Sequence, residues 1–220
     1  MAIESLYVVI PAFNESKHIS GVIKGVRPFA KNIVVVDDGS SDSTSKLAKD
    51  SGAVVLRHVI NLGKGAALKT GCDFAVKKGA EDIVVIDADG QHEPEDIPKF
   101  LSALKDSDIV FGQRKPSNNM PVILRFGNWF IDTAISLLFG IRLKDTQCGY
   151  RAFTAAAYRK IRWKASDYSM ESEMIANAGK KHLKYGAITI KTIYHEKYKG
   201  TTAFDGVKIV FNLIKWRLFR

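Results

Sequence analysis

Short runs of Val and Ile alternate along this chain with longer stretches of helical periodicity, and this alternation limits the possible folds more than any other feature. Short apolar runs are typical of strands that are covered on both faces of a sheet. They lie at Leu6–Ile10, Ile33–Val36, Val54–Leu56, Ile83–Ile86 and Ile109–Phe111. The helical patterns between them lie at residues 16–27, 42–51, 64–78 and 95–105. The alternation predicts an α/β fold with a mainly parallel sheet flanked by helices.

The composition fits one globular domain with a short appendage. The chain has 220 residues, of which 46% are hydrophobic, so it can bury the core of an α/β domain. Cys72 and Cys148 lie far apart without a histidine cluster, which argues against a disulfide framework or a zinc site and favours a reducing compartment. The first residues lead into a strand without the pattern of a signal peptide. We expect a main domain at residues 1–204 and a separate helix at residues 205–220.

The chain is basic, with a net charge of +10. Such a surface attracts polyanions, and nucleic acid, anionic lipid and phosphorylated substrates all qualify. The C-terminal stretch, residues 205–220, places Lys208, Lys215 and Arg217 among Val, Ile, Phe, Leu and Trp. Basic residues beside aromatic ones are typical of a helix that lies on an anionic membrane surface. Packing of this helix against the domain explains the pattern equally well.

Polar residues directly follow the first two predicted strands. The first strand ends in Pro11-Ala12-Phe13-Asn14-Glu15 and the second in Asp37-Asp38-Gly39-Ser40. Open α/β sheets bind their ligands at these carboxyl ends. An aspartate there can accept a hydrogen bond from a base or a ribose hydroxyl, and Phe13 offers a base an apolar surface. The Asp-Gly-Ser sequence is also typical of a turn with a helix cap, which is compatible with a ligand at the same place.

A glycine-rich, basic stretch follows the third strand, NLGKGAALKTG at residues 61–71. It does not match the P-loop, because the earlier glycine and the Ser or Thr after the lysine are both missing. Gly63 and Gly65 allow a tight turn into a helix whose N-terminus faces the same edge of the sheet, with Lys64 available to a phosphate. A purely structural turn explains the stretch equally well.

Two carboxylates follow the fourth strand, in the stretch VVIDADGQHEP. Asp87 and Asp89 face the same side if strand geometry persists through Ala88. Two carboxylates so close repel each other unless a cation lies between them or they share a proton. Oxygen ligands of this kind suit Mg²⁺ or Mn²⁺, which borrow further ligands from water and from a substrate phosphate. Gln91 and His92 follow within reach and could complete the set.

Five motifs in order resemble those of glycosyltransferase family 2, in particular its dolichyl- or polyprenyl-phosphate mannosyl- and glucosyltransferase branch. They are VVIPAFNE, VVVDDGSSDST, NLGKGAAL, DADGQHEPEDI and FGQR, and the resemblance covers about residues 5–175. It implies a GT-A fold, a nucleotide-sugar donor, a divalent cation and inversion at the anomeric carbon.

The resemblance also implies roles for individual residues. The nucleotide-binding set comprises Pro11, Phe13, Glu15, Val36, Asp37, Asp38, Lys64, Asp87 and Ala88. The proposed ligands of Mg²⁺ or Mn²⁺ are Asp87, Asp89 and Gln91. The residues expected to act on the reacting groups are Asp89, Arg114, Arg125 and Lys197, the last three through phosphate charge. Arg114 belongs to the FGQR motif, and a plain surface arginine is its alternative.

The stretch VILRFGNWFIDTAISLLFGI, residues 122–141, is apolar except for one stripe. Arg125, Asn128, Asp132 and Ser136 recur at helical spacing. The charges within it argue against a membrane span. We predict a helix near the membrane surface whose polar stripe faces the active site, with a plain buried helix as the alternative.

The remaining motifs follow the family less closely. KDTQCGYRAF resembles a strand that returns to the sheet, and DYSMESEMI resembles the start of the next helix. Glu171 and Glu173 are expected to be solvated, although Glu171 could act as a base toward a saccharide hydroxyl. Where the branch often has Arg-x-x-Gly-x-Ser-Lys, this chain has Lys197, Thr202 and Ala203. A lysine neutralises phosphate without the bidentate fork of arginine, so the identity of the sugar stays open.

These patterns together predict a metal-dependent, inverting enzyme on the cytoplasmic face of a membrane. It would move a hexose, mannose or glucose, from a GDP- or UDP-sugar to dolichyl or polyprenyl phosphate, with no nucleic-acid partner. A family 2 enzyme acting on a saccharide hydroxyl is the first alternative, and a nucleic-acid-binding module is a more distant one. A nucleotidyltransferase is disfavoured, because PAFNES lacks the Gly-rich, Arg-bearing loop with which such enzymes begin.

Overall fold

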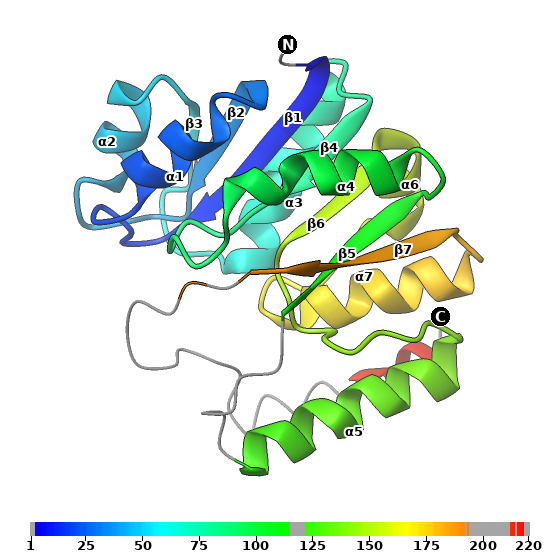
Figure 1. Cartoon of the computed structure of the whole chain (residues 1–220). Coiled ribbons are helices and arrows are strands. Elements are labelled where there is room, and N and C mark those ends of the chain that lie inside the picture. The colour runs from blue at the N-terminus through cyan, green and yellow to red at the C-terminus, as the bar shows by residue number, and fades with distance from the viewer. Residues whose placement is uncertain (1–2, 115–121, 192, 194–211, 214, 218–220) are drawn as a thin grey trace.

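The computed structural model describes residues 3–114, 122–191, 193, 212, 213 and 215–217, with side chains left out at 3 and 122–128. Its centre is a seven-stranded sheet in the order β3-β2-β1-β4-β6-β5-β7 (Figure 1). The strands are β1 (Ile3–Ala12), β2 (Ala30–Asp37), β3 (Val54–Arg57), β4 (Asp82–Val85), β5 (Ile109–Arg114), β6 (Arg151–Thr154) and β7 (Tyr185–Ile190). Every strand predicted from an apolar run is present, and the predicted α/β class is confirmed.

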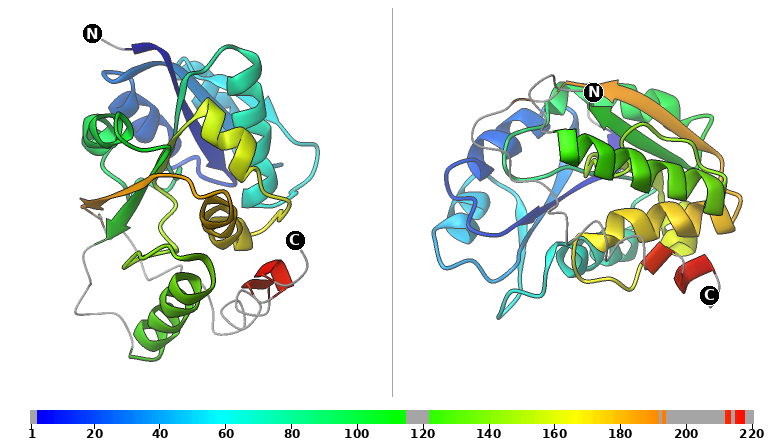
Figure 2. Two further views of the ribbon diagram at one scale, coloured as in Figure 1. Left: turned by 90° about the vertical axis from the view of Figure 1, so that its right-hand side faces the viewer. Right: turned by 90° about the horizontal axis from the view of Figure 1, so that it is seen from below.

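Helices cover both faces of the sheet (Figures 1 and 2). They are α1 (Ile19–Val26), α2 (Thr44–Asp50), α3 (Lys64–Lys77), α4 (Ile97–Leu104), α5 (Val122–Phe139), α6 (Ala155–Ile161) and α7 (Ser169–Lys180), with a short 3₁₀ turn, η1 (Pro94–Asp96), before α4. Helices α1, α2 and α4 share one apolar cluster with the sheet, and α3, α6 and α7 share another on the opposite face. Helix α5 packs on α7 rather than on the sheet.

The sheet is mainly parallel, with one reversed strand. Strand β1 pairs in parallel with β2 and β4, so their carboxyl ends lie at the same edge. Strand β6 runs antiparallel between β4 and β5. It is the returning strand that the KDTQCGYRAF motif predicts, and it separates β4 from the next strand along the chain.

Alternation along the strands divides the core between the two faces. In β1, Val8 is buried in the cluster with α1 and α4, whereas Val9 is buried in the cluster with α3 and α7. Successive side chains of a strand point to opposite faces, so a strand covered on both sides is apolar throughout. This explains why the strands of this chain read as uninterrupted Val and Ile runs.

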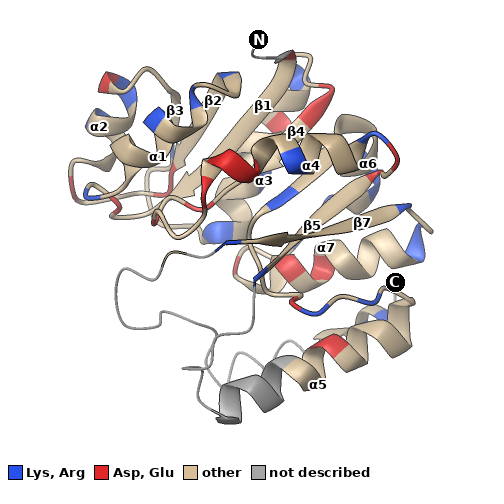
Figure 3. Ribbon diagram, in the orientation of Figure 1, with Lys and Arg blue, Asp and Glu red and all other residues tan. Residues whose placement is uncertain are grey.

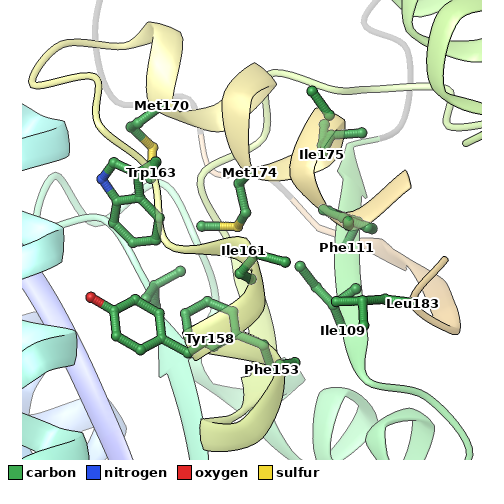
Figure 4. Packing of buried hydrophobic residues seen from close by; sticks show 14 of the residues in the cluster. Ile109, Phe111, Phe153, Tyr158, Ile161, Trp163, Met170, Met174, Ile175 and Leu183 are labelled. Carbon is green, nitrogen blue, oxygen red and sulfur yellow. The ribbon is translucent and has the colours of Figure 1, made fainter. Parts of the chain in front are cut away.

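An aromatic cluster joins α6 and α7 to the sheet. Figure 4 shows Met170 and Met174 of α7 packed near Trp163, with Tyr158 and Phe153 alongside. The indole N–H of Trp163 donates to the carbonyl oxygen of Gly65, at 2.8 Å. Because Met170 lies in the first turn of α7 and Gly65 in the first turn of α3, the cluster places the starts of these two helices together.

The predicted helix at residues 122–141 is confirmed as α5, a continuous helix of 18 residues. Ile131, Ile135 and Phe139 are buried, whereas Trp129 and Leu137 expose 58% and 81% of their surface. The apolar residues of α5 therefore face both the protein and the solvent. Among the helices that the structure describes, none is long and apolar enough to cross a membrane.

The described residues of the C-terminal stretch pack on the domain. Leu213 and Trp216 are buried in the same cluster as α7, while Lys215 and Arg217 are exposed. The Lys180 ammonium also donates to the carbonyl oxygen of Trp216. These contacts favour the packing alternative for this helix. Most of residues 205–220 lie outside the described residues, so the boundary at residue 204 stays a prediction.

Close contact between α3 and the sheet leads to a first prediction. A Cβ at Gly71 would lie 2.4 Å from Val9 Cγ1 and 2.9 Å from Val36 Cγ2. We therefore expect Gly71→Ala to destabilise the fold by about 1–3 kcal/mol, because the core must shift to accept the methyl group. Urea denaturation measures this difference. Gly21→Ala is the control, since α1 has open space at that position, and we expect a gain of about 0.5–1 kcal/mol. Equal stabilities of the two variants would contradict this packing.

Candidate active site

The loops after β1 and β2 are joined at the carboxyl edge of the sheet. The backbone N–H of Asn14 donates to Ser40 Oγ at 2.9 Å, and the N–H of Glu15 donates to Thr44 Oγ1 at 2.8 Å. Asn14 has a left-handed backbone, with φ of 55°, which turns the chain sharply after β1. The two predicted strand tips therefore form one surface.

The two aspartates at the end of β2, Asp37 within the strand and Asp38 directly after it, hold the surrounding loops in place. Asp38 accepts from the backbone N–H groups of Leu62 and Gly63, at 3.0 and 2.8 Å, and its carboxylate lies 2.6 Å from His58 Nδ1. Asp37 accepts from the N–H of Ser40 at 2.8 Å. Both side chains are almost completely buried. Asp38 thus fixes the loop that leads to Lys64, while its predicted contact with a nucleoside stays a prediction.

The other predicted nucleotide-binding residues differ in exposure. The Phe13 ring is 46% exposed beside this surface, as a stacking residue requires, and Glu15 is partly exposed. Pro11, Val36 and Ala88 are buried. The Val36 side chain faces α3, so any contribution of Val36 to a nucleotide site would come from its backbone.

Lys64 lies between two carboxylates that are far apart in the sequence. Its Nζ is 2.8 Å from Asp87 Oδ1 and 2.9 Å from Glu171 Oε1. Burial alone would lower the pKa of Lys64, but the charges of Asp87 and Glu171 raise it above its usual range. Burial alone would raise the pKa of Asp87, but Lys64 and His92 lower it well below its usual range. Lys64 and Asp87 therefore both carry charge at neutral pH, and Glu171 completes the triad as the second carboxylate partner of Lys64.

Backbone geometry makes room for this triad. Gly63 has φ of 96°, and a Cβ there would lie 2.4 Å from the carbonyl oxygen of Ser166, so the predicted tight turn into α3 requires glycine. A Cβ at Gly149 would lie 2.5 Å from Asp87 Oδ2 and 2.9 Å from Lys64 Nζ. The chain before β6 therefore passes directly against the triad.

The residues after β4 depart from strand geometry before the acidic pair. Strand β4 ends at Val85, and Ala88 and Asp89 lie in a turn, so strand geometry does not persist through Ala88. Asp87 faces Lys64, and Asp89 Oδ1 instead accepts from the N–H of Gln91 at 3.0 Å. Within the described part of the chain, no cluster of three or more His, Cys, Asp or Glu residues is arranged to hold a metal ion.

The donor atoms near Asp89 nevertheless fit a cation that takes most of its ligands from elsewhere. Asp89 and Gln91 are both partly exposed and both carry side-chain oxygens. Mg²⁺ is commonly bound by one or two carboxylates together with waters and substrate phosphates. His92 is buried 3.5 Å from Asp87, and its Nδ1 has no hydrogen-bond partner among the described residues. Asp89 and Gln91 are thus the residues we expect to hold a cation, with Asp87 alongside.

The predicted phosphate-binding arginines and lysine are placed differently. Arg114, at the end of β5, forms a bidentate ion pair with Asp145, with Nε–Oδ2 and Nη2–Oδ1 distances of 2.7 and 3.0 Å. Arg125 lies in the described backbone of α5, but its side chain is outside the described set. Lys197 lies outside the described residues altogether.

Asp132 connects α5 to the segment next to Arg114. It accepts from the N–H and the hydroxyl of Thr146, at 3.2 and 2.7 Å. Burial and the charge of Asp145 outweigh these hydrogen bonds and raise the pKa of Asp132 to about 6. The polar stripe of α5 therefore faces the protein at this position, and its orientation toward the active site stays a prediction.

The raised pKa of Asp132 predicts a pH-dependent effect of Asp132→Asn. Between about pH 4 and pH 6 the folded state holds this proton more tightly than the unfolded chain, so the contribution of Asp132 to stability falls as pH rises. Asparagine keeps the acceptor for Thr146 and removes the charge. We expect the variant to be more stable by about 1–2 kcal/mol at pH 7.5 and equal to the parent below pH 4. Denaturation at both pH values tests this, and a pH-independent difference would contradict it.

Two acids of α7 are buried, contrary to the expectation from the sequence. Glu171 and Glu173 are 3% and 1% exposed, so the expectation that they are solvated is wrong. Each has a partner that compensates for its burial, since Glu171 pairs with Lys64 and Glu173 accepts from the N–H of Ala165 at 2.8 Å. The sequence does carry a signal for this burial. Glu171 and Glu173 lie among Met and Ile residues, and helical periodicity places them on the buried side of α7.

Comparison with known proteins identifies the family. The protein-family sequence model described as Glycosyl transferase family 2 matches residues 7–162 of this chain. The chain belongs to this family. UDP-N-acetylglucosamine–dolichyl-phosphate N-acetylglucosaminyltransferase of Methanococcus voltae is 34% identical over 99% of this chain and 98% of that protein. Undecaprenyl-phosphate mannosyltransferase of Micrococcus luteus is 27% identical over 96% of this chain and 93% of that protein.

A solved structure supports the fold of this family 2 member. Glucosyl-3-phosphoglycerate synthase from Mycobacterium tuberculosis, in complex with Mn²⁺, UDP and phosphoglyceric acid, aligns with a TM-score of 0.76. The alignment covers 99% of this chain and 80% of the other, at 18% identity. At that identity the likeness shows the fold alone, and it confirms the predicted GT-A architecture.

Proposed function

We propose that this glycosyltransferase moves a sugar from a nucleoside diphosphate to dolichyl or polyprenyl phosphate at a membrane surface, with inversion at the anomeric carbon. Two relatives are named for transfer to dolichyl phosphate and undecaprenyl phosphate. One of them carries N-acetylglucosamine in its name and the other mannose, so the proposal includes N-acetylhexosamines beside mannose and glucose. The structural neighbour bound to Mn²⁺ and UDP supports a nucleotide donor and a divalent cation.

The observation that carries the lipid acceptor is the surface of α5. Trp129, Phe130 and Leu137 expose large apolar side chains on this helix. Among the side chains of α5 that the structure describes, at residues 129–139, that of Asp132 is the one with a charge (Figure 3). Exposed aromatic and aliphatic residues on a basic protein suit a helix that lies in the interface of an anionic membrane.

Helix α5 is also connected, through short contacts, to Arg114, the candidate phosphate-binding residue. Asp132 of α5 bonds to Thr146, and the neighbouring Asp145 pairs with Arg114. A polyprenyl chain on α5 would therefore present its phosphate near Arg114. Arginine binds phosphate with the same bidentate geometry that it uses for a carboxylate, so a phosphate could replace Asp145 as its partner. Arg125 and Lys197 are proposed to add positive charge to this side.

The donor side of the proposed reaction uses the residues after β4 and the first residue of α3, Lys64. Asp89 and Gln91 would hold Mg²⁺ or Mn²⁺, which when bound stabilises the negative charge on the leaving diphosphate. Lys64 lies at the same edge and carries positive charge for a phosphate oxygen. A lipid phosphate is already ionised at neutral pH, so its attack needs no general base.

A transfer assay with matched acceptors tests the proposal. The protein is incubated with Mn²⁺ and radiolabelled GDP-mannose, UDP-glucose or UDP-N-acetylglucosamine. Each donor is offered with dolichyl phosphate, dolichol or a methyl glycoside. We expect transfer to dolichyl phosphate and none to dolichol, which has the same chain without the phosphate. Transfer to the methyl glycoside at a comparable rate would instead support the saccharide-hydroxyl alternative.

A further inference from the structure

Glu171 and Asp87 share a single lysine, and this arrangement has a consequence for the donor site. The Glu171 side chain is 4% exposed and that of Lys64 is 16% exposed, and both carboxylate contacts of Lys64 are shorter than 3.0 Å. An ammonium group has three N–H donors. Two of them point to Asp87 and Glu171, which leaves one for another acceptor at the carboxyl edge of the sheet.

We propose that Glu171 is a positioning residue that acts through Lys64, holding its ammonium where the remaining N–H can bind the donor diphosphate. This inference rests on the proposed function, because it assumes a diphosphate at this edge. Asp87 belongs to the acidic pair beside the expected cation, so its carboxylate has two competing positive partners, the cation and the Lys64 ammonium. Glu171 lies on another element and keeps Lys64 paired whatever Asp87 binds.

The surroundings of Glu171 are rigid enough for this role. The guanidinium of Arg151 donates to the backbone carbonyl oxygen of Glu171 at 2.8 Å, which fixes the first turn of α7. Met170, next in sequence, is buried in the aromatic cluster around Trp163. Trp163 also binds the first turn of α3, from which Lys64 extends. The two partners are therefore held by one packed unit.

The ion pair also argues against Glu171 as a general base. A base must accept a proton from the acceptor hydroxyl with an oxygen that is available to it. Here the carboxylate is buried and its Oε1 is bound to the Lys64 ammonium. A positioning role and a base role predict different effects of the same substitution, since positioning alters donor affinity and a base alters the chemical step.

Calorimetric binding of UDP and GDP in the presence of MnCl₂ distinguishes these roles. We expect Glu171→Gln to weaken binding of the preferred nucleotide about tenfold, the size typical of one charge-assisted hydrogen bond. Lys64→Met should weaken it by at least as much. The double variant should bind no more weakly than Lys64→Met alone, because Glu171 acts through the lysine. Glu171→Asp, which keeps the charge, should recover part of the affinity and guards against a variant that fails to fold.

The control is Asp50→Asn, which removes a Lys–carboxylate contact of 2.6 Å on the exposed surface of α2. It should leave nucleotide binding unchanged. Unchanged affinity in Glu171→Gln, or fully additive losses in the double variant, would overturn the inference. An altered pH profile of kcat with normal nucleotide affinity would assign Glu171 as a base instead. Nucleotide binding by the parent without transfer to dolichyl phosphate would refute the proposed acceptor alone, whereas a parent that binds neither nucleotide would refute both proposals.

Discussion

Replacing Asp89 with alanine is expected to abolish the thermal stabilisation that a nucleotide sugar gives in the presence of Mn²⁺. A ligand at one hundred times its Kd stabilises the folded state by about 2.7 kcal/mol, which for a domain of this size raises Tm by roughly 5–10 °C. Asp89 Oδ1 is bonded to the N–H of Gln91, so the carboxylate is oriented beside the second expected ligand. Without it, the cation would lose its carboxylate and the diphosphate its bridge to the protein.

The matched control for Asp89→Ala is a substitution of Glu95. This exposed acid lies in η1, shortly after Asp89, so Glu95→Ala removes the same charge from the same region without a proposed ligand. Scanning fluorimetry with GDP- and UDP-sugars, with and without Mn²⁺, measures both variants. We expect the parent shift in Glu95→Ala and none in Asp89→Ala. Equal shifts in Asp89→Ala and the parent would refute the assignment of the cation to Asp89.

The local sequence was sufficient to predict the strands and the edge of the sheet at which the site lies. The run Ile33–Val36 predicts β2, which extends to Ala30–Asp37 because flanking residues join the hydrogen-bonded ladder of β1. The polar residues after β1, β2 and β4 do meet at one edge, since the carboxyl ends of neighbouring parallel strands lie together. These features depend on periodicity and chain direction, which a sequence displays directly.

Pairings between distant segments could not be predicted in the same way. The sequence does not predict that the Lys64 ammonium lies between Asp87 and Glu171, the second of which is 107 positions away. Arg114 was expected to face a phosphate and is paired with Asp145. Asp145 lies in the loop before β6, the strand that enters the sheet in reverse between β4 and β5, and Glu171 lies on α7, which follows β6 in the chain. Charge and spacing alone do not specify which carboxylate a cation meets.

Arg151→Met is expected to destabilise the fold by about 3–5 kcal/mol, the largest stability effect that we predict. Arg151 is 1% exposed, and its guanidinium donates to the carbonyl oxygens of Cys148, Thr146 and Glu171 at 3.0, 2.8 and 2.8 Å. It also lies 5.2 Å from the centre of the Phe111 ring. A methionine fills much of the volume but leaves the loop carbonyls of Cys148 and Thr146 without this donor, while the carbonyl of Glu171 keeps its N–H partner within α7.

Two opposing contributions to the free energy of unfolding determine whether Arg151→Met stabilises or destabilises the fold. Burial lowers the pKa of Arg151, which means that its charge is costly to hold inside the protein, and methionine removes that cost. Each carbonyl left unpaired costs about 1–3 kcal/mol, and those of Cys148 and Thr146 together outweigh the gain. Urea denaturation of Arg151→Met, with the exposed Arg159→Met of α6 as control, measures the balance, and the control should change by less than about 0.5 kcal/mol. A variant as stable as the parent would show that the loop before β6 and the first turn of α7 stay in place without the arginine.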